Sequence, residues 1–296
     1  MPYSYKSLTE TLSGVGIDEA ADEAVLLLER FAGASRVSLM TDRDRVYDVT
    51  ALDDAVEKRK GRYPLQYILG TWEFFGLPFA VDERCLVPRP DTECLVEQAI
   101  RLVPAGGRFA DLCTGSGCIA VATLAHRPDL TAAALELYPD TLALAVKNAE
   151  DNDVAARFAP VCADLLNGGP EALQSHAPFD AILSNPPYIP TSVIDGLSPE
   201  VHHEPFAALD GGEDGLIFYR AILRDYASLL KPGGLMLLEI GYDQAEALRA
   251  LCAEYLPGCG VSVLRDLGGN DRVVRVTLSS NRSYTAENYL QKGFAP

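Results

Sequence analysis

The sequence Asn185-Pro186-Pro187-Tyr188 carries the most specific chemistry in the chain, and it follows the apolar run FDAILS. Proline fixes its own φ, removes an N–H group and holds the preceding residue out of the α region, so this turn is rigid. The side-chain oxygen of Asn185 and the main-chain oxygen of Pro186 can therefore face outward as two fixed acceptors. Two acceptors match an NH2 group, and Tyr188 adds an aromatic face for a planar substrate.

Such a turn suits methylation of a nitrogen whose lone pair is delocalised, as in a carboxamide or an exocyclic base amine. Because that nucleophile is poor, hydrogen bonds to both N–H groups would move electron density onto nitrogen and aim its lone pair at a sulfonium methyl group. We expect Asn185, Pro186 and Tyr188 to be catalytic, and all four residues from Asn185 to Tyr188 to bind the substrate. No metal-ligand spacing occurs, so we predict no metal.

A glycine-containing turn, Asp111-Leu112-Cys113-Thr114-Gly115-Ser116-Gly117-Cys118, leads from an apolar run directly into a helical pattern. Its glycines allow the backbone to approach a ligand closely, and the start of the helix offers free N–H groups to a carboxylate. The third glycine of the dinucleotide fingerprint is absent, which favours a ligand without a pyrophosphate over NAD.

Two acidic residues follow the next two apolar runs. Glu136 ends the run AAALE, where a carboxylate can accept hydrogen bonds from both ribose hydroxyls of an adenosine. Asp164 is positioned to meet the adenine amino group, although an isolated aspartate there is more often a helix cap. These features predict S-adenosylmethionine (AdoMet) as the cofactor.

The elements around these motifs alternate between strand and helix patterns, which predicts an α/β fold with a doubly wound sheet. Ligands of such sheets bind outside the carboxyl ends of the strands. The expected helices span 118–126, 140–151, 214–230 and 243–255, and the expected strands span 108–113, 131–136, 157–162, 179–184, 234–240, 260–265 and 271–278.

The N-terminal residues have a different pattern, because apolar positions from Glu19 to Phe31 recur at helical spacing. A second helix over 51–60 ends in KRKGR, which we interpret as a solvated helix end. Residues 64–88 contain aromatic and β-branched residues interrupted by glycine and proline, as in a linking hairpin. Arg89-Pro90-Asp91-Thr92-Glu93 then begins a helix that Asp91 or Thr92 could cap.

Composition limits the classes of function. With 296 residues, of which 48% are hydrophobic and 23% charged, the chain can form two folded domains. Its net charge of −17 disfavours a broad phosphate-binding surface, so we expect no direct nucleic-acid substrate. The seven cysteines form no C-x-x-C pair and are expected to be reduced, buried thiols. Without a membrane span or a signal-peptide pattern, we expect a cytoplasmic protein that has no membrane partner.

Longer segments resemble one family. NPPY after DLCTGSGC is shared by many class I methyltransferases that act on amides or on base amines. The segments PLQYILGTWEFFGLPFAVDERCLVPRPDTECLVE, EVHHEPFAALDGGEDGLIFYR and LRDLGGNDRVV resemble the bacterial PrmC/HemK family, the glutamine methyltransferases of peptide chain release factors. The resemblance extends from about residue 15 to 278.

The resemblance implies a Rossmann-like class I methyltransferase with a seven-stranded sheet, which N5-methylates the glutamine in the Gly-Gly-Gln motif of class 1 release factors. It implies an N-terminal helical substrate-recognition domain over 1–63, a linking hairpin over 64–88, an AdoMet-dependent domain over 89–280 and a tail over 281–296. The expected AdoMet-binding residues are Asp111, Thr114, Gly115, Ser116, Gly117, Glu136, Asp164 and Asn185.

This sequence departs from the family pattern at two positions, with Glu136 where aspartate is usual and Cys113 where glycine is frequent. Arg89 and Asp91 are candidates either for the pocket or for a structural ion pair and cap. Two alternatives remain. One is a ribosomal protein glutamine methyltransferase, disfavoured by the RPDTE and ALDGGEDG segments, and the other is a DNA or RNA amino-methyltransferase, disfavoured by the net charge.

Overall fold

The computed structural model describes residues 2–280, and the expected tail over 281–296 lies outside them. The chain forms two compact units, of which the first contains residues 1–71 together with 197–203, and the second contains 72–196 and 204 onward. The short segment 197–203 was not expected in the N-terminal unit. Each unit has its own buried apolar residues.

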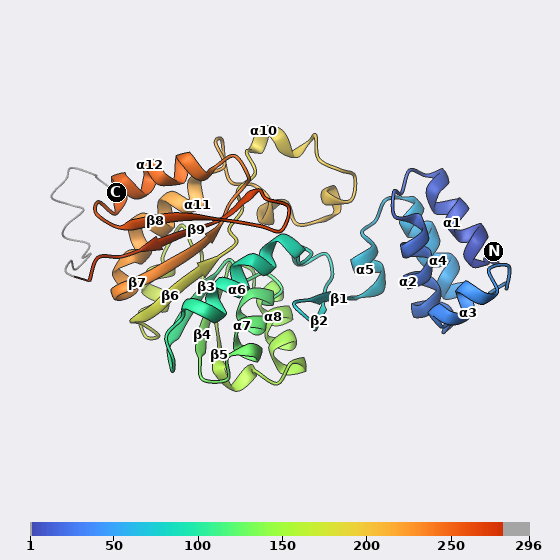
Figure 1. The fold of residues 1–296 in the computed structure, drawn as a ribbon, viewed down its shortest axis with the longest axis horizontal. Coiled ribbons are helices and arrows are strands. Elements are labelled where there is room, and N and C mark those ends of the chain that lie inside the picture. The colour runs from blue at the N-terminus through green and yellow to red at the C-terminus, as the bar shows by residue number, and fades with distance from the viewer. Residues whose placement is uncertain (1, 281–296) are drawn as a thin grey trace. The chain divides into compact units, whose positions relative to one another are not determined.

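The N-terminal unit consists of packed helices, coloured blue in Figure 1. Leu27 and Leu28 of the second helix are fully buried, as the helical spacing predicts. Arg59 is only 4% exposed and binds Glu23 and Glu200, so the interpretation of KRKGR as a solvated helix end is wrong at this residue. The helices are α1 (Tyr5–Gly14), α2 (Ala20–Ala32), α3 (Arg36–Thr41), α4 (Thr50–Lys60) and α5 (Leu65–Leu69).

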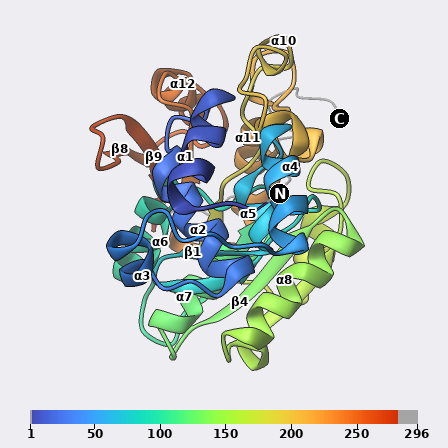
Figure 2. The same ribbon diagram turned by 90° about the vertical axis from the view of Figure 1, so that its right-hand side faces the viewer.

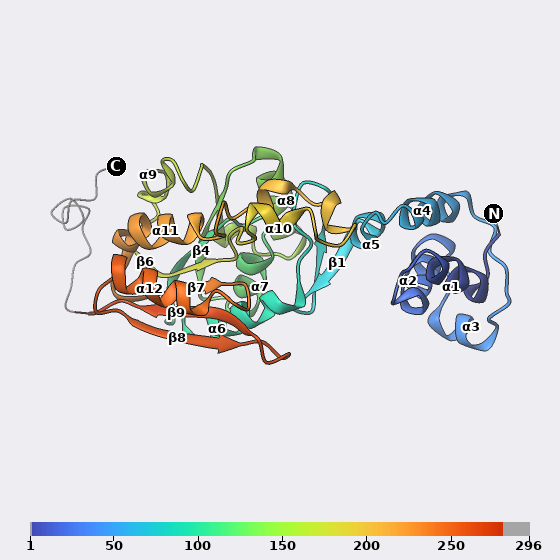
Figure 3. The same cartoon turned by 90° about the horizontal axis from the view of Figure 1, so that it is seen from above.

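The larger unit is built on a seven-stranded sheet, which confirms the predicted α/β architecture. The order of its strands is β5-β4-β3-β6-β7-β9-β8. The first five strands in this order are parallel, whereas β9 is antiparallel to both β7 and β8, and β8 and β9 lie side by side in Figure 3. The strands are β3 (Arg108–Leu112), β4 (Thr131–Glu136), β5 (Phe158–Cys162), β6 (Phe179–Ser184), β7 (Leu230–Glu239), β8 (Gly260–Arg265) and β9 (Asp271–Thr277).

Helices cover the sheet because its strands are apolar on both faces. Every residue of α7 from Cys118 to Leu124 is buried, and α8 packs against β4 and β5 (Figure 2). A separate cluster of buried residues joins α11 and α12 to the sheet. The helices are α6 (Glu93–Leu102), α7 (Cys118–His126), α8 (Pro139–Asp151), α9 (Gly169–Leu173), α10 (Thr191–Ile194), α11 (Ile217–Ala221) and α12 (Ala245–Tyr255).

Three expected features differ in detail. Residues 65–69 form α5, and only then does the hairpin of β1 (Thr71–Phe74) and β2 (Leu77–Ala80) begin. The continuous helix expected over 214–230 is divided into α11, a π-helical turn over 222–226 and a 3-10 turn over 227–229. All seven cysteines are free, but the expectation that they are buried holds only for Cys85, Cys118 and Cys252. Cys94, Cys113 and Cys259 are half-buried, and Cys162 is exposed at the end of the edge strand β5.

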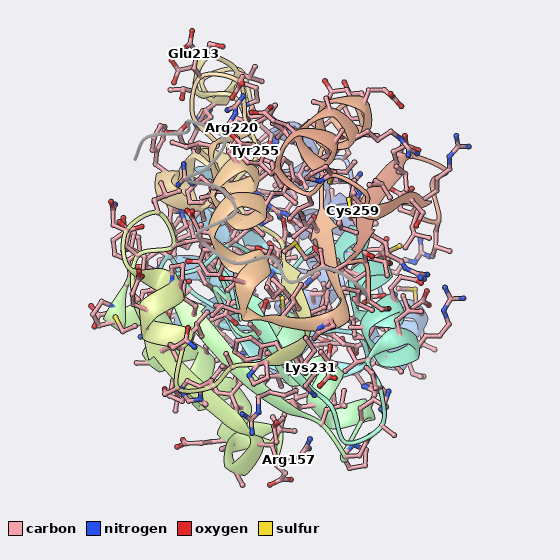
Figure 4. The ribbon with its side chains drawn as sticks, turned by 90° about the vertical axis from the view of Figure 1, so that its left-hand side faces the viewer. Arg157, Glu213, Arg220, Lys231, Tyr255 and Cys259 are labelled. Carbon is pink, nitrogen blue, oxygen red and sulfur yellow. The ribbon has the colours of Figure 1, made fainter. Side chains whose placement is uncertain are left out.

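Cations at the amino ends of the parallel strands are held by structural contacts. Lys231 forms an ion pair with Asp180 at 2.8 Å, and Arg157 donates to the carbonyl oxygens of Leu124, Arg127 and Leu130. Lys231 and Arg157 are both labelled in Figure 4. Lys231 and Arg157 therefore both have partners within the protein, and neither requires a bound polyanion.

Candidate active site

A cavity lies at the carboxyl ends of β3, β4 and β6, where the sequence predicts the site. It encloses about 920 Å³ of space, part of which is open to solvent. In α/β sheets of this kind, ligands bind at this position outside the carboxyl ends of the strands. Of the expected residues, the cavity wall contains Thr114, Gly115, Ser116, Glu136, Asp164, Asn185 and Pro187.

Asp111 lies beneath the glycine turn and does not line the cavity. Its Oδ2 accepts hydrogen bonds from the hydroxyl of Thr114 at 2.6 Å and from the N–H of Ala120 at 3.2 Å. Complete burial raises the pKa of Asp111 to about 7, although both hydrogen bonds oppose this shift. Asp111 therefore joins the turn to the first part of α7.

Backbone geometry explains the glycines of this turn. Gly115 and Gly117 have φ values of 55° and 82°, in the left-handed region that favours glycine. A Cβ at Gly117 would also lie 3.1 Å from the Cβ of Ala145 in α8, so Gly117 permits close packing of the two helices. Cys113 has a φ of 59°, also in the left-handed region, where glycine would be less strained than cysteine.

Glu136 ends β4 and is 8% exposed. Its Oε2 accepts from the N–H of Gly115 at 3.0 Å, and its Oε1 accepts from the N–H groups of Leu137 and Tyr138 at 2.9 and 3.2 Å. Burial raises the pKa of Glu136, against the lowering effect of these three hydrogen bonds. The carboxylate is thus fixed between two turns that both contribute to the cavity wall.

Asp164 follows β5 and lies on the same wall. Its Oδ1 accepts from the N–H of Leu166 at 2.8 Å, and its Oδ2 accepts from the side-chain amide of Asn167 at 2.8 Å. These contacts stabilise a turn, which agrees with the local role that an isolated aspartate often has. The turn also fixes the carboxylate beside the apolar wall residue Leu165.

Asn185 is directed by a contact that the sequence did not reveal. Its Nδ2 donates to the hydroxyl oxygen of Thr92 at 3.2 Å, which leaves the side-chain oxygen Oδ1 available to a ligand. Thr92 occupies the N-cap position of α6 but makes no side-chain capping bond, and Asp91 instead pairs with Arg272 at 3.3 Å. The prediction that Thr92 or Asp91 caps this helix through its side chain is therefore wrong, because both side chains bind elsewhere.

The backbone of Tyr188 is held by the ALDGGEDG segment. Ile189 forms a parallel bridge with Asp210, in which its N–H donates to the Leu209 carbonyl at 3.0 Å and its carbonyl accepts from the Gly211 N–H at 2.8 Å. A Cβ at Gly211 would lie 2.8 Å from the Tyr188 Cα, and one at Gly215 would lie 2.4 Å from the Tyr188 carbonyl oxygen. The side-chain amide of Gln244 donates to that same oxygen at 2.9 Å. Glycine is required here because backbone occupies the space of a side chain.

Tyr188 and Pro186 do not line the cavity. Burial raises the pKa of Tyr188 to about 12, so its hydroxyl stays protonated near neutral pH. Arg89 does line the cavity and pairs with Glu204, whose Oε2 also accepts from the N–H of Val87 at 2.9 Å. Arg89 therefore combines both roles that the sequence allowed, an ion pair and a place in the cavity wall.

Three residues near the site were missed in the sequence: Glu204, Glu239 and Gln244. Each is buried, and each contacts or neighbours a motif that was recognised. A polar residue inside an apolar run, as in LMLLEIG for Glu239, was the available signal. Among the described residues, no group of three or more acidic, histidine or cysteine side chains could hold a metal. No described helix is long and apolar enough to cross a membrane.

Comparison with known proteins supports this description at the level of domains and fold. Residues 5–70 match the PrmC N-terminal domain, and residues 91–197 match the methyltransferase small domain. A methyltransferase from Pyrococcus furiosus is 19% identical with a TM-score of 0.51, and covers 70% of this chain and 91% of its own. The hMettl16 catalytic domain, solved with an RNA hairpin, is 16% identical with a TM-score of 0.54, covering 81% and 86%. The fold and the cavity thus define a Rossmann-like methyltransferase.

Proteins named release factor glutamine methyltransferase match most of the chain. The protein from Caulobacter vibrioides is 39% identical over 92% of this chain and 94% of its own length. Those from Geobacter sulfurreducens and Cereibacter sphaeroides are 40% and 41% identical, over 89% and 90% of this chain and 91% and 94% of their own lengths. The chain belongs to the release factor glutamine methyltransferase family.

Proposed function

We propose that this protein transfers a methyl group from AdoMet to the side-chain nitrogen of the glutamine in the Gly-Gly-Gln motif of class 1 release factors. The observation that carries this proposal is the orientation of Asn185. Its Nδ2 is bound to Thr92, so its Oδ1 is the free acceptor in a cavity that also contains Glu136 and Gly115. An acceptor oxygen next to a nucleoside-type site suits a substrate that presents an NH2 group.

The polar and apolar groups that line the cavity fit AdoMet. Glu136 offers carboxylate oxygens to ribose hydroxyls, and Asp164 offers an acceptor to an amino group. Leu135, Leu137 and Ile119 supply apolar wall for an adenine ring. When bound, AdoMet would supply a methyl group activated by its positive sulfur. We assign Asp111 and Gly117 a supporting role beneath the turn formed by Thr114, Gly115 and Ser116.

The chain's own residues would orient the acceptor nitrogen. The Oδ1 of Asn185 and the carbonyl oxygen of Pro186 would accept one N–H each, which draws electron density onto the amide nitrogen and aligns its lone pair. Because Tyr188 keeps its proton and does not line the cavity, it would hold the NPPY turn in place rather than act as a base. Orientation of this kind can contribute about 7–11 kcal/mol to a barrier reduction. Once methylated, the nitrogen can release its proton to solvent.

The N-terminal unit is the candidate for recognising the release factor, and the chain would work in the cytoplasm, where translation terminates. The match of residues 5–70 to the PrmC N-terminal domain supports this division of roles. The net charge of −17 supports a protein substrate over a nucleic acid.

Methyl transfer from labelled AdoMet tests the proposal directly. Purified release factor, ribosomal protein and a single-stranded oligonucleotide are incubated side by side with the enzyme. We expect label in one Gly-Gly-Gln peptide of the release factor, located by mass spectrometry. Label confined to the ribosomal protein or to the oligonucleotide would overturn the assignment of the substrate.

A further inference from the structure

Glu239 is a buried carboxylate next to Asn185 that the proposed function leaves without a role. It ends β7 and is 1% exposed. In the pairing of β6 with β7, Ser184 lies opposite Leu238, so the residues that follow, Asn185 and Glu239, leave neighbouring strands side by side. The hydroxyl of Tyr219 donates to the Glu239 carbonyl at 2.6 Å and fixes its backbone.

Thr92 connects the two side chains. Its hydroxyl oxygen accepts the hydrogen bond from Asn185 Nδ2, and Thr92 is itself only 2% exposed. A hydroxyl that accepts one hydrogen bond still has one proton to donate. Glu239 is the adjacent acceptor, whose carboxylate takes hydrogen bonds from both Thr92 and Asn185, although its Oε2 is buried without a hydrogen-bond partner among the described residues. Burial raises the pKa of Glu239 to about 7, against the lowering effect of hydrogen bonds from Thr92 and Asn185.

We propose that Glu239 is a positioning residue that acts both directly and through Thr92 to hold the Asn185 amide with its NH2 group turned inward and its Oδ1 turned toward the methyl acceptor. This inference rests on the proposed function, because it assumes that Asn185 binds the NH2 group of the substrate. It assigns no contact between Glu239 and the substrate.

Two physical effects favour this role. A side-chain amide that turned by 180° would present NH2 to the substrate's NH2, and its own oxygen would face the Thr92 hydroxyl oxygen. Ionised Glu239 opposes that flip because it orients the Thr92 proton toward itself and leaves Thr92 as an acceptor for Asn185. The chain of hydrogen bonds also polarises the amide, which makes Oδ1 a better acceptor.

The charge of Glu239 depends on the groups around it. Arg272 lies nearby on β9, but its guanidinium is already shared between Asp266 at 3.1 Å and Asp91 at 3.3 Å. The titratable groups that interact with Glu239 are Asp91 beside Thr92, Arg272 on β9, Tyr188 after β6, Tyr219 on α11, Cys94 on α6 and Cys118 on α7. The cysteines and tyrosines are neutral near pH 7, since burial raises the pKa of each.

The test compares the full-length protein with Glu239→Gln, Thr92→Val and the double variant. We measure kcat with saturating release factor, the KM for release factor and the Kd of AdoMet. Each single variant should lower kcat by about tenfold, the rate equivalent of one net hydrogen bond, while the Kd of AdoMet changes little. The double variant should be no slower than the slower single variant, because both changes break the same chain.

Two further measurements distinguish a positioning role of Glu239 and Thr92 from a general loss of structure. Thr92→Ser keeps the hydroxyl and should retain most of the activity that Thr92→Val loses. Thr123→Val is the control and should leave kcat unchanged, since Thr123 is buried in α7 and its hydroxyl has no partner among the described residues. In wild type, kcat should rise with pH through about 7 as Glu239 ionises, and Glu239→Gln should lose this rise.

Additive effects in the double variant, or a Kd of AdoMet that weakens in proportion to kcat, would overturn the role of Glu239. If wild type instead methylates the ribosomal protein or the oligonucleotide, the substrate assignment fails separately. The same variants are then assayed with that acceptor, because any planar NH2 group needs Oδ1 of Asn185 facing it.

Discussion

At the scale of single residues, Asn185 should separate catalysis from cofactor binding. Asn185→Ala removes an acceptor for the substrate's NH2 group, so we expect turnover to fall by about 100-fold or more, as for loss of one preorganised polar group in an active site. The Kd of AdoMet should stay within several-fold, because Glu136 and the glycine turn are untouched. Isothermal titration and single-turnover assays measure the two effects. Asn152→Ala is the control, since the Asn152 side chain donates to the backbone carbonyls of Pro78 and Asn148 and does not line the cavity.

If the Kd of AdoMet rose in step with the loss of turnover, Asn185 would belong to the cofactor site alone. The substrate's NH2 group would then need a different hydrogen-bond acceptor, and the orientation of Asn185 by Thr92 would not contribute to catalysis.

Asp111 should make the protein less stable as pH rises. Its pKa is about 7 in the folded state and about 3.9 in an unfolded chain, so between these values the folded state binds more protons. Stability therefore decreases as pH rises through this range, by up to about 1.4 kcal/mol per pH unit, and levels off above it. Asp111→Asn cannot ionise and should lack this contribution. Urea unfolding of both proteins between about pH 5 and pH 8 measures it.

Asp129→Asn is the matched control, because hydrogen bonding to Arg127 lowers the pKa of Asp129 far below this range. If the free energy of unfolding changed with pH in the same way for wild type and Asp111→Asn, the Asp111 carboxyl would be ionised in the folded protein over this whole pH range.

At the scale of elements, the glycines of ALDGGEDG should set the position of Tyr188. Gly211→Ala would place a Cβ 2.8 Å from the Tyr188 Cα, so the backbone at the NPPY turn must shift. A displacement of about 1 Å can cost about 100-fold in rate, so we expect kcat to fall much more than AdoMet affinity. Gly260→Ala in β8 is the control, because its Cβ would meet nothing closer than 3.8 Å. Equal kcat values for the two variants would contradict this account.

The central strands β4 and β6 were predictable because each is a short apolar run that ends in a polar residue, Glu136 or Ser184. The expected runs 131–136, 179–184 and 260–265 agree residue for residue with β4, β6 and β8. Parallel strands that are buried on both faces leave this signature in the sequence. Since the site of such a sheet lies at those ends, Glu136 and Asn185 could be assigned to one cavity before its shape was known.

The contacts that connect elements distant in sequence could not be predicted in this way. Thr92 has the spacing of a helix cap, and only the fold brings Asn185, which is 93 residues away, to its hydroxyl. Likewise Arg59 belongs to a basic run that suits a solvated helix end, yet Glu200, which lies 141 residues further along the chain, binds it. A local sequence pattern does not predict such partners, because it contains no information on which loops come into contact.

At the scale of the whole molecule, the chain passes between its two units three times, because residues 197–203 belong to the N-terminal unit. Glu200 binds this segment to that unit through Arg59 at 3.0 Å and Arg62 at 2.7 Å. Both ends of the segment continue into the larger unit, whose NPPY turn lies only a few residues before it. Glu200 thus anchors the segment to the helices of the N-terminal unit, together with the ring contact between Tyr63 and His203.

Glu200→Gln should therefore weaken use of the release factor without affecting AdoMet. Arg59 keeps its pair with Glu23, so we expect a loss of about 1.5–3 kcal/mol in the contacts of the segment, as for hydrogen bonds to a charged group. Amide hydrogen exchange over 197–203 should accelerate, and the KM for release factor should rise while the Kd of AdoMet stays constant. Glu57→Gln, which removes only the exposed pair with Lys60, is the control. Faster exchange with an unchanged KM would mean that the segment is anchored for stability alone, and that the N-terminal unit acts on the substrate independently of this link.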